Sequence, residues 1–248
     1  MDRLIYIAMT GAAQVLNQQA VTTHNLANAS TTGFKAETAT FRAVPIKGPG
    51  LPTRTYAVDA TAGANLAAGT IQRTGRDLDV AIEGDGFLAV QALDGSEAYT
   101  RNGSLGIDAD GQLQTRSGMA VLGEGGPITI PPDAKIAIGR DGTVSASING
   151  QSAANVAILG KIKLVNPAQG ELNRRADGLF RTTNGSPADA DSTVALVGGA
   201  LEASNVNSIA TMVEMITLAR QYELHMKILQ TAEQNAQKAS QLLTASGQ

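Results

Sequence analysis

The stretch that decides the fold is NVNSIATMVEMITLARQYELHMKILQTAEQNAQKASQLLT, residues 205–244, which contains no proline and no glycine. Its apolar and small residues recur at intervals of three and four, the spacing of one face of an α-helix. The positions are Met212, Ile216, Ala219, Tyr222, Met226, Leu229, Ala232, Ala236, Ala239 and Leu243. A helix of about 39 residues would be on the order of 58 Å long. A small domain cannot cover that length, so much of this face is expected to meet another helix.

The N-terminus offers the nearest partner helix. Residues 1–28 contain no proline and a single glycine. A weaker apolar seam runs through Ile5, Met9, Ala12, Leu16, Ala20, Thr23 and Ala27. Polar residues dilute it toward its end, and STTG, residues 30–33, stops the helix. The pattern predicts a terminal helical assembly domain, residues 1–33 plus 205–248.

Short apolar runs separated by glycine-containing turns predict β structure between the helices. Residues 78–82 and 87–90 flank Gly84-Asp85-Gly86 and are expected to form a hairpin. Asp-Gly pairs predict three more turns, at residues 94–95, 110–111 and 141–142. Strand-like runs cover residues 128–130, 135–138, 143–148 and 156–165. The predicted fold class is α+β: paired, coiled-coil-like terminal helices and a central antiparallel all-β domain, residues 69–204, of barrel or sandwich type.

Residues 34–68 differ from both zones. Prolines stand at positions 45, 49 and 52, and glycines at 48 and 50. Proline cannot continue a helix and is excluded from the middle of a sheet. This segment is therefore predicted to be an extended connector.

Composition narrows the function. Hydrophobic residues make up 43% of the 248 residues, enough to bury a core. The net charge is −3 with no basic block, which argues against nucleic-acid binding, and the absence of cysteine excludes disulfides and thiolate chemistry. No apolar run approaches the roughly 18 residues of a membrane span. The N-terminus also lacks the charge and apolar pattern of a cleaved signal peptide.

The side chains that carry chemistry do not form a recognisable site. The two histidines, His24 and His225, fall on predicted helix faces. The run Asp108-Ala109-Asp110-Gly111 lacks the remaining ligands of a calcium loop, so it is interpreted as a turn. Asp77 and Asp79 would share one strand face, which leaves a hydrolase or lyase as a rival hypothesis. We expect no catalytic, cofactor or metal site.

Four segments, in order, resemble the flagellar rod and hook protein family. They are HNLANASTTGFK (residues 24–35), TGRDLDVAIEGDGFLAV (74–90), YTRNGSLGIDADGQLQTRSGMAVLG (99–123) and GALEASNVNSIATMVEMITLARQYELHMKIL (199–229). His24 stands where the family usually has Asn, and Leu88 and Leu105 stand where it has Phe. The segments cover both ends and the centre of the chain.

The resemblance implies a structural subunit of the flagellar basal-body rod, which assembles helically around the axial export channel and transmits torque to the hook. Its partners would be copies of itself, neighbouring rod proteins and the flagellar type III export apparatus, with no small-molecule substrate. It would be exported without signal cleavage. Within the family, residues 1–30 and 41–56 most resemble a proximal rod subunit, and a distal rod subunit is the alternative. A secreted β adhesin with oligomerising helical ends is a further, less favoured hypothesis.

The residues expected to carry assembly lie at both ends. Asn25 and Asn28 either fix the turn after the first helix and its contacts with neighbours through their side-chain amides, or simply cap the helix. Phe34 anchors the chain beyond it. Asn205, Asn207 or Ser208 caps the second helix. The full predicted interface is Ile5, Met9, Leu16, Asn25, Leu26, Ala27, Asn28, Phe34, Leu201, Asn205, Val206, Asn207, Met212, Ile216, Tyr222, Met226 and Leu229.

Overall fold

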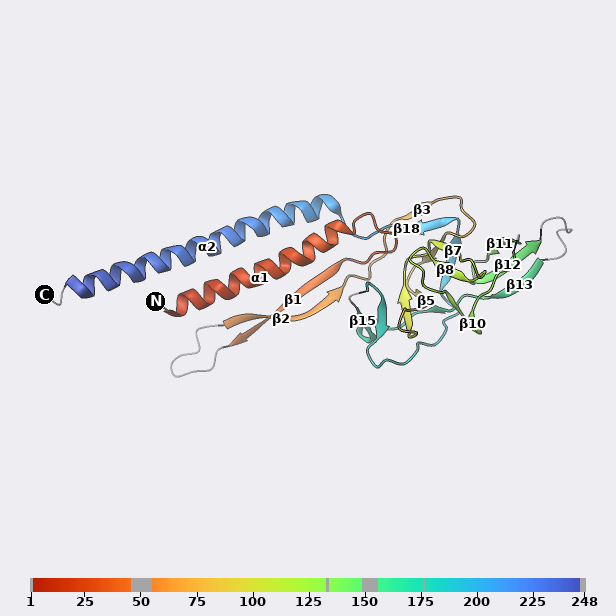
Figure 1. Cartoon of the computed structure of the whole chain (residues 1–248), viewed down its shortest axis with the longest axis horizontal. Helices are drawn as coiled ribbons and strands as arrows, with labels where there is room; N and C mark the ends of the chain where they lie inside the picture. Colours follow the sequence, from red (N-terminus) through yellow and green to blue (C-terminus); the bar gives the residue numbers. More distant parts are fainter. Residues whose placement is uncertain (1, 46–54, 133, 149–155, 176, 246–248) are drawn as a thin grey trace. The chain divides into compact units, whose positions relative to one another are not determined.

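The computed structural model describes residues 2–45, 55–132, 134–148, 156–175 and 177–245. The chain has an N-terminal helix, a mostly-β central region and a C-terminal helix (Figure 1). It divides into two compact units. Unit 1 contains both helices and the first two strands, and unit 2 contains residues 28–36 and 66–206.

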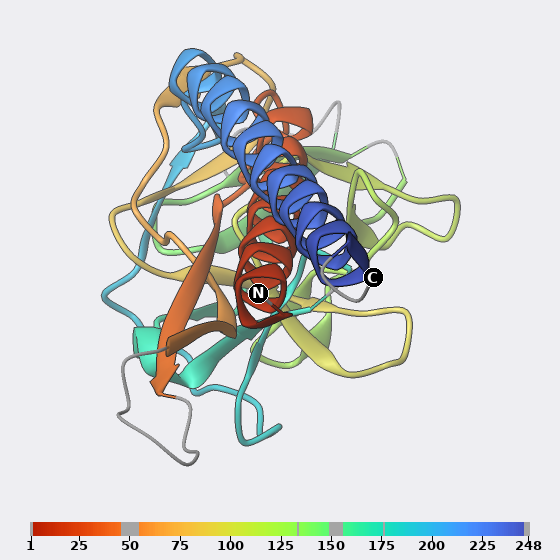
Figure 2. The ribbon, with the colours of Figure 1, turned by 90° about the vertical axis from the view of Figure 1, so that its left-hand side faces the viewer.

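Unit 1 is a helix pair with a hairpin beside it. Helix α1 (Asp2–Ala27) and helix α2 (Ser208–Ala245) pack side by side and run in opposite directions (Figures 1 and 2). Strands β1 (Glu37–Pro45) and β2 (Thr55–Ala64) contact α1. Asn207 caps α2, because its side-chain oxygen accepts a hydrogen bond from the Ala210 N–H at 3.1 Å.

The segment predicted as an extended connector contains a pairing that the sequence did not reveal. β1 and β2 form an antiparallel hairpin that runs from Glu37 opposite Ala64 to Pro45 opposite Thr55. A two-stranded sheet consists only of edge strands, and there a terminal proline such as Pro45 costs no ladder hydrogen bond. The remaining prolines and glycines of the prediction, at 48, 49, 50 and 52, lie outside the described residues.

Unit 2 is built from short antiparallel strands and one 3₁₀ turn, η1 (Gln169–Glu171). The strands are β3 (Ile71–Arg73), β4 (Val80–Glu83), β5 (Phe87–Gln91), β6 (Glu97–Thr100), β7 (Leu105–Ile107), β8 (Leu113–Thr115), β9 (Leu122–Gly123), β10 (Gly126–Pro127), β11 (Ala134–Ile138), β12 (Thr143–Ile148), β13 (Val156–Lys161), β14 (Leu164–Val165), β15 (Leu172–Arg174), β16 (Phe180–Thr182), β17 (Ala195–Gly198) and β18 (Ala200–Glu202).

These strands form several small sheets around one aliphatic core. The largest has the order β14-β5-β6-β16-β15, a second is β11-β12-β13, and the others are two-stranded. None of the sheets formed by the described residues closes into a barrel. The core is dominated by valine, leucine and isoleucine, as a chain with 3% aromatic residues requires. Its fully buried members include Val80, Leu88, Val90, Leu113 and Val121.

Three of the four predicted turns are confirmed as hairpin turns, and one is wrong. The Asp-Gly pairs at 94–95, 110–111 and 141–142 connect β5 to β6, β7 to β8 and β11 to β12, and each glycine has a positive φ, as predicted. The hairpin predicted around Gly84-Asp85-Gly86 is wrong. β4 pairs with β17 and β5 pairs with β6 and β14, so this turn passes the chain from one sheet to another. Residues 128–130 form only an isolated bridge, between Thr129 and Gln112.

Candidate assembly interface

The face of α1 that packs within unit 1 is lined by small side chains. Its buried residues are Ala8, Ala12, Val15 and Thr22. Of the predicted interface residues, Met9 and Leu16 are exposed, at 51% and 47%. Ile5 and Leu26 are half-buried and Ala27 is exposed. The predicted single seam therefore separates into an inner face of small residues and an outer face that keeps the larger ones.

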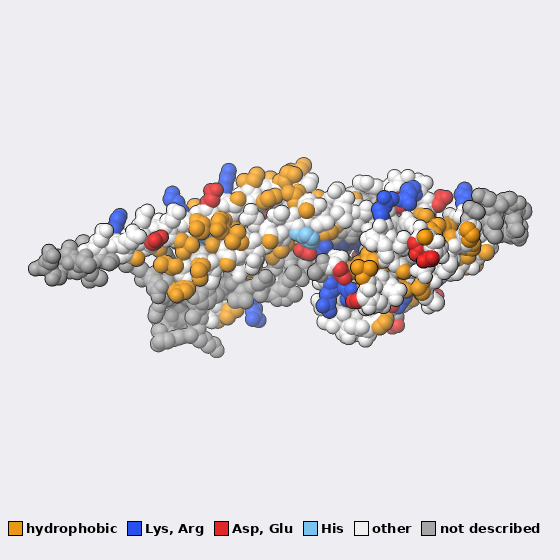
Figure 3. All heavy atoms as spheres, viewed as in Figure 1, with side chains coloured by type: hydrophobic (Ala, Val, Ile, Leu, Met, Phe, Trp, Pro, Cys, Tyr) orange, Lys and Arg blue, Asp and Glu red, His pale blue; other side chains and the backbone are white. Residues whose placement is uncertain are grey.

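Helix α2 also has an inner and an outer face, although its inner face includes larger side chains. Leu218 and Ala232 are buried, while Tyr222 and Leu229 of the predicted interface are half-buried on the same face. Met212, Ile216 and Met226 are exposed. Further exposed apolar residues on this helix are Ile209, Val213, Leu224 and Ile228. Figure 3 shows hydrophobic side chains gathered along the helices.

An exposed apolar surface of this extent is typical of a protein–protein contact. The stripe on α1 is Tyr6, Met9 and Leu16, and the stripe on α2 is Ile209, Met212, Val213, Ile216, Leu224 and Ile228. We call these together the outer apolar stripes. Apart from Leu218, the fully buried side chains of the two helices are small, whereas most of the large apolar side chains remain exposed and available for other molecules.

The predicted interface residues Asn25 and Asn28 make different kinds of contact. The Asn25 amide N–H donates to the Glu37 carbonyl at 2.8 Å, and its oxygen accepts from the Glu37 N–H at 2.7 Å. This pair of bonds joins the end of α1 to the start of β1. Asn28 lies in unit 2 and forms a local turn, with its side-chain oxygen accepting from the Thr31 hydroxyl at 3.1 Å. Asn25 thus makes tertiary contacts, whereas Asn28 makes a turn.

A buried cluster of charges lies in unit 2 where the chain enters and leaves it. The Glu202 carboxylate accepts hydrogen bonds from Lys35 Nζ at 2.7 Å, from the Gly69 N–H at 2.7 Å and from Arg101 at 3.0 Å. The side chains of Lys35, Arg101 and Glu202 are each at most 2% exposed. Lys35 Nζ also donates to the Ala67 carbonyl at 2.8 Å. We call Lys35, Arg101 and Glu202 the ion cluster.

Burial and charge act against each other at Lys35. Desolvation lowers the pKa of Lys35 below its ordinary 10.5, and the hydrogen bond and charge of Glu202 oppose that shift. Arg101 supplies a second cation to the same carboxylate and also stacks over Phe87, 5.3 Å from the ring centroid. One anion therefore holds two buried cations.

Asn205 makes a second set of bonds among the same segments. Its side-chain oxygen accepts from the Ala36 N–H at 2.7 Å, and its amide donates to the Ala67 carbonyl at 3.0 Å. Phe34 is buried, with the Arg174 guanidinium 4.5 Å from its ring centroid. Leu201 and Val206 are half-buried nearby in sequence. Segments 28–36, 66–70 and 200–206 are therefore tied together inside unit 2.

Sequence reasoning missed the ion cluster, although a signal for it was present. Lys35, Arg101 and Glu202 each stand inside one of the segments that resemble the rod and hook family. They lie far apart along the chain, so only their shared membership in those segments connects them before the structure is known.

The histidine and aspartate side chains considered as possible catalytic groups contact different partners. His24 contacts Glu37 at 3.1 Å, whereas His225 packs on Gly11. Asp79 is buried in an ion pair with Arg76 at 3.1 Å, and Asp77 is exposed. Within the described ranges no three acidic or histidine side chains are arranged to hold a metal ion. No helix in the described part of the chain is long and apolar enough to cross a membrane.

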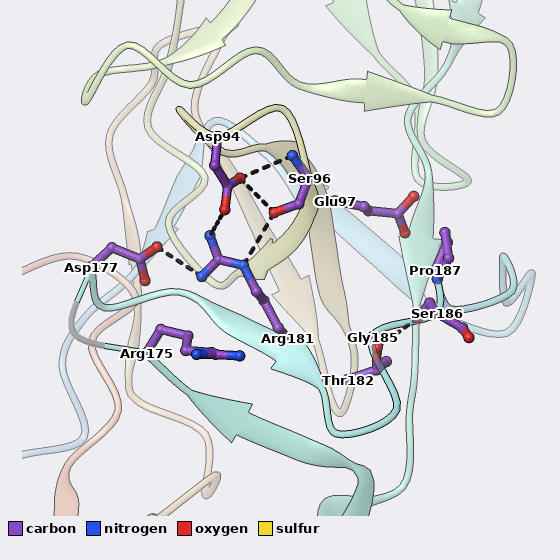
Figure 4. A pocket seen from close by; sticks show the side chains of 10 residues that line it. All are labelled: Asp94, Ser96, Glu97, Arg175, Asp177, Arg181, Thr182, Gly185, Ser186 and Pro187. Carbon is purple, nitrogen blue, oxygen red and sulfur yellow. Dashed lines mark hydrogen bonds and ion pairs between the residues drawn. The ribbon is translucent and has the colours of Figure 1, made fainter.

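An open cavity of about 610 Å³ in unit 2 is lined by polar side chains (Figure 4). Arg181 points into it and contacts Asp177 at 2.8 Å, Ser96 at 3.3 Å and Asp94 at 3.5 Å. The Ser96 hydrogen bonds hold the pKa of Asp94 below its usual value. The guanidinium is thus already occupied by groups of this chain.

Comparisons with known proteins agree with the segments noted in the sequence. Residues 5–35 match the family described as flagella basal body rod protein, residues 81–146 the flagellar hook protein FlgE/F/G D1 domain, and residues 197–242 the flagellar basal body rod FlgEFG protein C-terminal. The flagellar basal-body rod protein FlgF of Escherichia coli is 49% identical, over 99% of this chain and 100% of the relative. The chain belongs to the flagellar basal-body rod protein family.

Other members of this rod family are also similar over their full length. FlgF of Salmonella typhimurium is 46% identical over 99% of this chain and all of the relative. FlgG of Buchnera aphidicola subsp. Schizaphis graminum is 36% identical over 96% of this chain and 98% of the relative. The similarity to these FlgF proteins exceeds the similarity to this FlgG. The terminal matches cover most of α1 and most of α2, and the central match lies in unit 2.

Proposed function

We propose that this chain is a structural subunit of the proximal part of the rod, assembling helically around the axial export channel and transmitting torque toward the hook. The observation that carries the proposal is the pair of outer apolar stripes, on a chain 49% identical to FlgF of Escherichia coli over its full length. Burial of each large apolar side chain against a neighbour would contribute roughly 1.5–3 kcal/mol. Several such residues on each helix therefore favour assembly over the isolated chain.

The proposed division of labour follows from where apolar groups remain exposed. The ends of the chain, residues 1–33 and 205–248, would form the assembly domain, whose helices pack in coiled-coil fashion, with residues 34–68 connecting them to the β part. Residues 69–204 would form an outer domain that keeps its own core. The partners would be copies of this chain, neighbouring rod subunits and the export apparatus. In this role the protein catalyses no reaction and binds no cofactor.

The test replaces one outer apolar side chain with a charge. Ile216 is 56% exposed, so Ile216→Asp should leave the fold of the chain intact while placing a carboxylate in the contact with a neighbour. In cells that lack this gene, the wild-type gene should restore rods and swimming, and Ile216→Asp should restore neither. Gln221→Asp, an equal charge at another exposed position of α2, is the matched control and should swim.

Two results would count against the proposal. Normal rods and swimming with Ile216→Asp would remove the packing role of the stripe. A deletion strain that still builds complete rods would remove the rod function altogether. If rods in the deletion strain lack only their distal part, the distal rod alternative is favoured.

A further inference from the structure

The imidazole of His225 on α2 lies directly against the backbone of Gly11 on α1. A Cβ atom built at residue 11 would stand 2.5 Å from Cε1 of His225, 3.0 Å from Nδ1 and 3.1 Å from Nε2. Real Cβ contacts are not that short, so a side chain at position 11 would force the ring of His225 to leave its present position. Gly11 forms a notch, and His225 fills it.

Both residues cost stability where they stand. Glycine in a helix interior is unfavourable relative to alanine, and Gly11 is the single glycine in α1 and α2. The Nδ1 atom of His225 is buried, with no hydrogen-bond partner among the described residues. An unpaired buried polar atom also reduces stability. Neither residue is explained by the stability of the helix pair.

Backbone hydrogen bonds from Gly33 to Glu202 and from Asn205 to Phe34 join the segment that follows α1 to the segment that precedes α2. Beyond them, side-chain packing between the helices specifies their register weakly. The inner face of α1 is formed by Ala8, Ala12, Val15 and Thr22, which are small and similar in size. The inner face of α2 repeats in threes and fours through Met215, Leu218, Tyr222, His225, Leu229 and Ala232. A slip of seven residues would again place apolar or small side chains opposite each other. It would also bring His225 opposite position 4 or 18, where Leu4 and Gln18 carry side chains and no notch exists.

We propose that Gly11 and His225 are positioning residues that fix the register in which α1 and α2 of one subunit pair. A polar residue at a single core position is known to set register in helix pairs at a cost in stability. In this pair, the fit of the His225 ring against Gly11 adds a steric constraint on the register to the one that a polar core residue provides. The proposal rests on the rod function, because its consequence is the alignment of the outer apolar stripes. Met9 and Leu16 face neighbours at fixed heights relative to Ile216 only in one register.

The first test is a double substitution read out in cells. In the deletion strain, Gly11→Ala should reduce swimming and rod number at least several-fold, although alanine favours a helix more than glycine does. Adding His225→Ala should recover much of the loss, because it removes the ring that meets the new methyl group. Adding His24→Ala instead, the other histidine of the chain, should recover nothing. Full swimming with Gly11→Ala alone would overturn the proposal. Equal recovery of swimming from added His225→Ala and from added His24→Ala would also overturn it.

The second test measures register itself. The chain has no cysteine, so spin labels at Asn17→Cys and Lys227→Cys, both exposed positions, report one distance between α1 and α2. The otherwise wild-type chain should give a single narrow distance. With His225→Ala, part of the population should shift, since one heptad of slip moves a helix by roughly 10 Å. An unchanged narrow distance with His225→Ala would overturn the register role.

The two failures remain distinguishable. The rod function itself fails if the deletion strain swims. The register role fails if the deletion strain is non-motile, the wild-type gene restores it, and Gly11→Ala restores it equally well.

Discussion

Replacing Glu202 by glutamine is the sharpest perturbation of unit 2 that the structure offers. Glutamine has nearly the same shape, but it has no charge, and its amide nitrogen would face donors. Lys35 and Arg101 approach the present carboxylate at 2.7 and 3.0 Å, and the Gly69 N–H approaches it at 2.7 Å. In Glu202→Gln both cations stay buried with no anion between them.

The expected loss of unfolding free energy in Glu202→Gln is large. Removing one partner of a buried ion pair costs about 3–5 kcal/mol, because the remaining charge is left uncompensated. A domain of this size is stabilised by about 5–15 kcal/mol in total. With roughly 2–4 °C per kcal/mol, the midpoint of thermal unfolding should fall by roughly 6–20 °C. Lys35→Met should cost less than Glu202→Gln, because it leaves Arg101 and Glu202 as a neutral pair.

The pKa of Lys35 gives this prediction a direction with pH. Burial already lowers that pKa below 10.5, and loss of Glu202 removes the group that opposes the shift. A lysine whose folded pKa is depressed adds stability above its unfolded pKa, and this stability is lost as pH falls through the folded value. The defect of Glu202→Gln should therefore shrink as pH rises toward 10.5 and deepen as pH falls.

The assay is calorimetric unfolding of the purified full-length chain. Glu83→Gln is the matched control, since Glu83 forms an ion pair with Arg140 at 2.6 Å in which the side chains are 51% and 74% exposed. Breaking an exposed pair should change stability by less than about 1 kcal/mol. If Glu202→Gln shifts the midpoint no more than Glu83→Gln does, or if Lys35→Met is the more harmful change, the account of the ion cluster is wrong.

Three further predictions follow from single residues. Burial raises the pKa of Tyr99 to about 12 from 10.0, so its contribution to stability is complete below pH 10 and is lost as pH rises through about 12; an ultraviolet absorbance titration should show one of the four tyrosines ionising last, and Tyr99→Phe should abolish that step. Leu218→Ala should cost about 2–5 kcal/mol of unfolding free energy, whereas Leu224→Ala, at an exposed position of the same helix, should cost little, as measured by helical circular dichroism on heating. Asn205→Ala should expose segments 28–36 and 66–70 to faster amide hydrogen exchange, and unchanged protection there would contradict its bridging role.

Local pattern and turn chemistry predicted much of the fold. The three-and-four spacing located both helices, and three Asp-Gly pairs located three hairpins, because each signal acts within a few residues. The failures involve partners distant in sequence. β4 is buried on both of its faces and pairs with β17, which lies more than a hundred residues later in the chain. Nothing near Val80–Glu83 specifies β17 as its partner.

The interface prediction shows a related limit. Periodicity placed Met9 and Leu16 on one seam with Ala12, and Ile216 on the seam of the second helix with Tyr222. A helix with apolar residues around much of its circumference, however, has more than one apolar face. Periodicity alone does not say which face meets the partner helix. Side-chain size decides it here: Ala8 and Ala12 pack inward, whereas Met9 and Leu16 remain outside.

This distribution of sizes bears on how the two units are stabilised. Unit 2 buries most of its large aliphatic residues and its ion cluster within itself, so its stability belongs to the single chain. Unit 1 buries mostly small residues and leaves its larger apolar groups exposed. The hydrophobic free energy available to unit 1 is therefore greater between chains than within one chain. Stability of the helix pair should rise with assembly more than that of unit 2, because most of the exposed large apolar side chains lie on the helices.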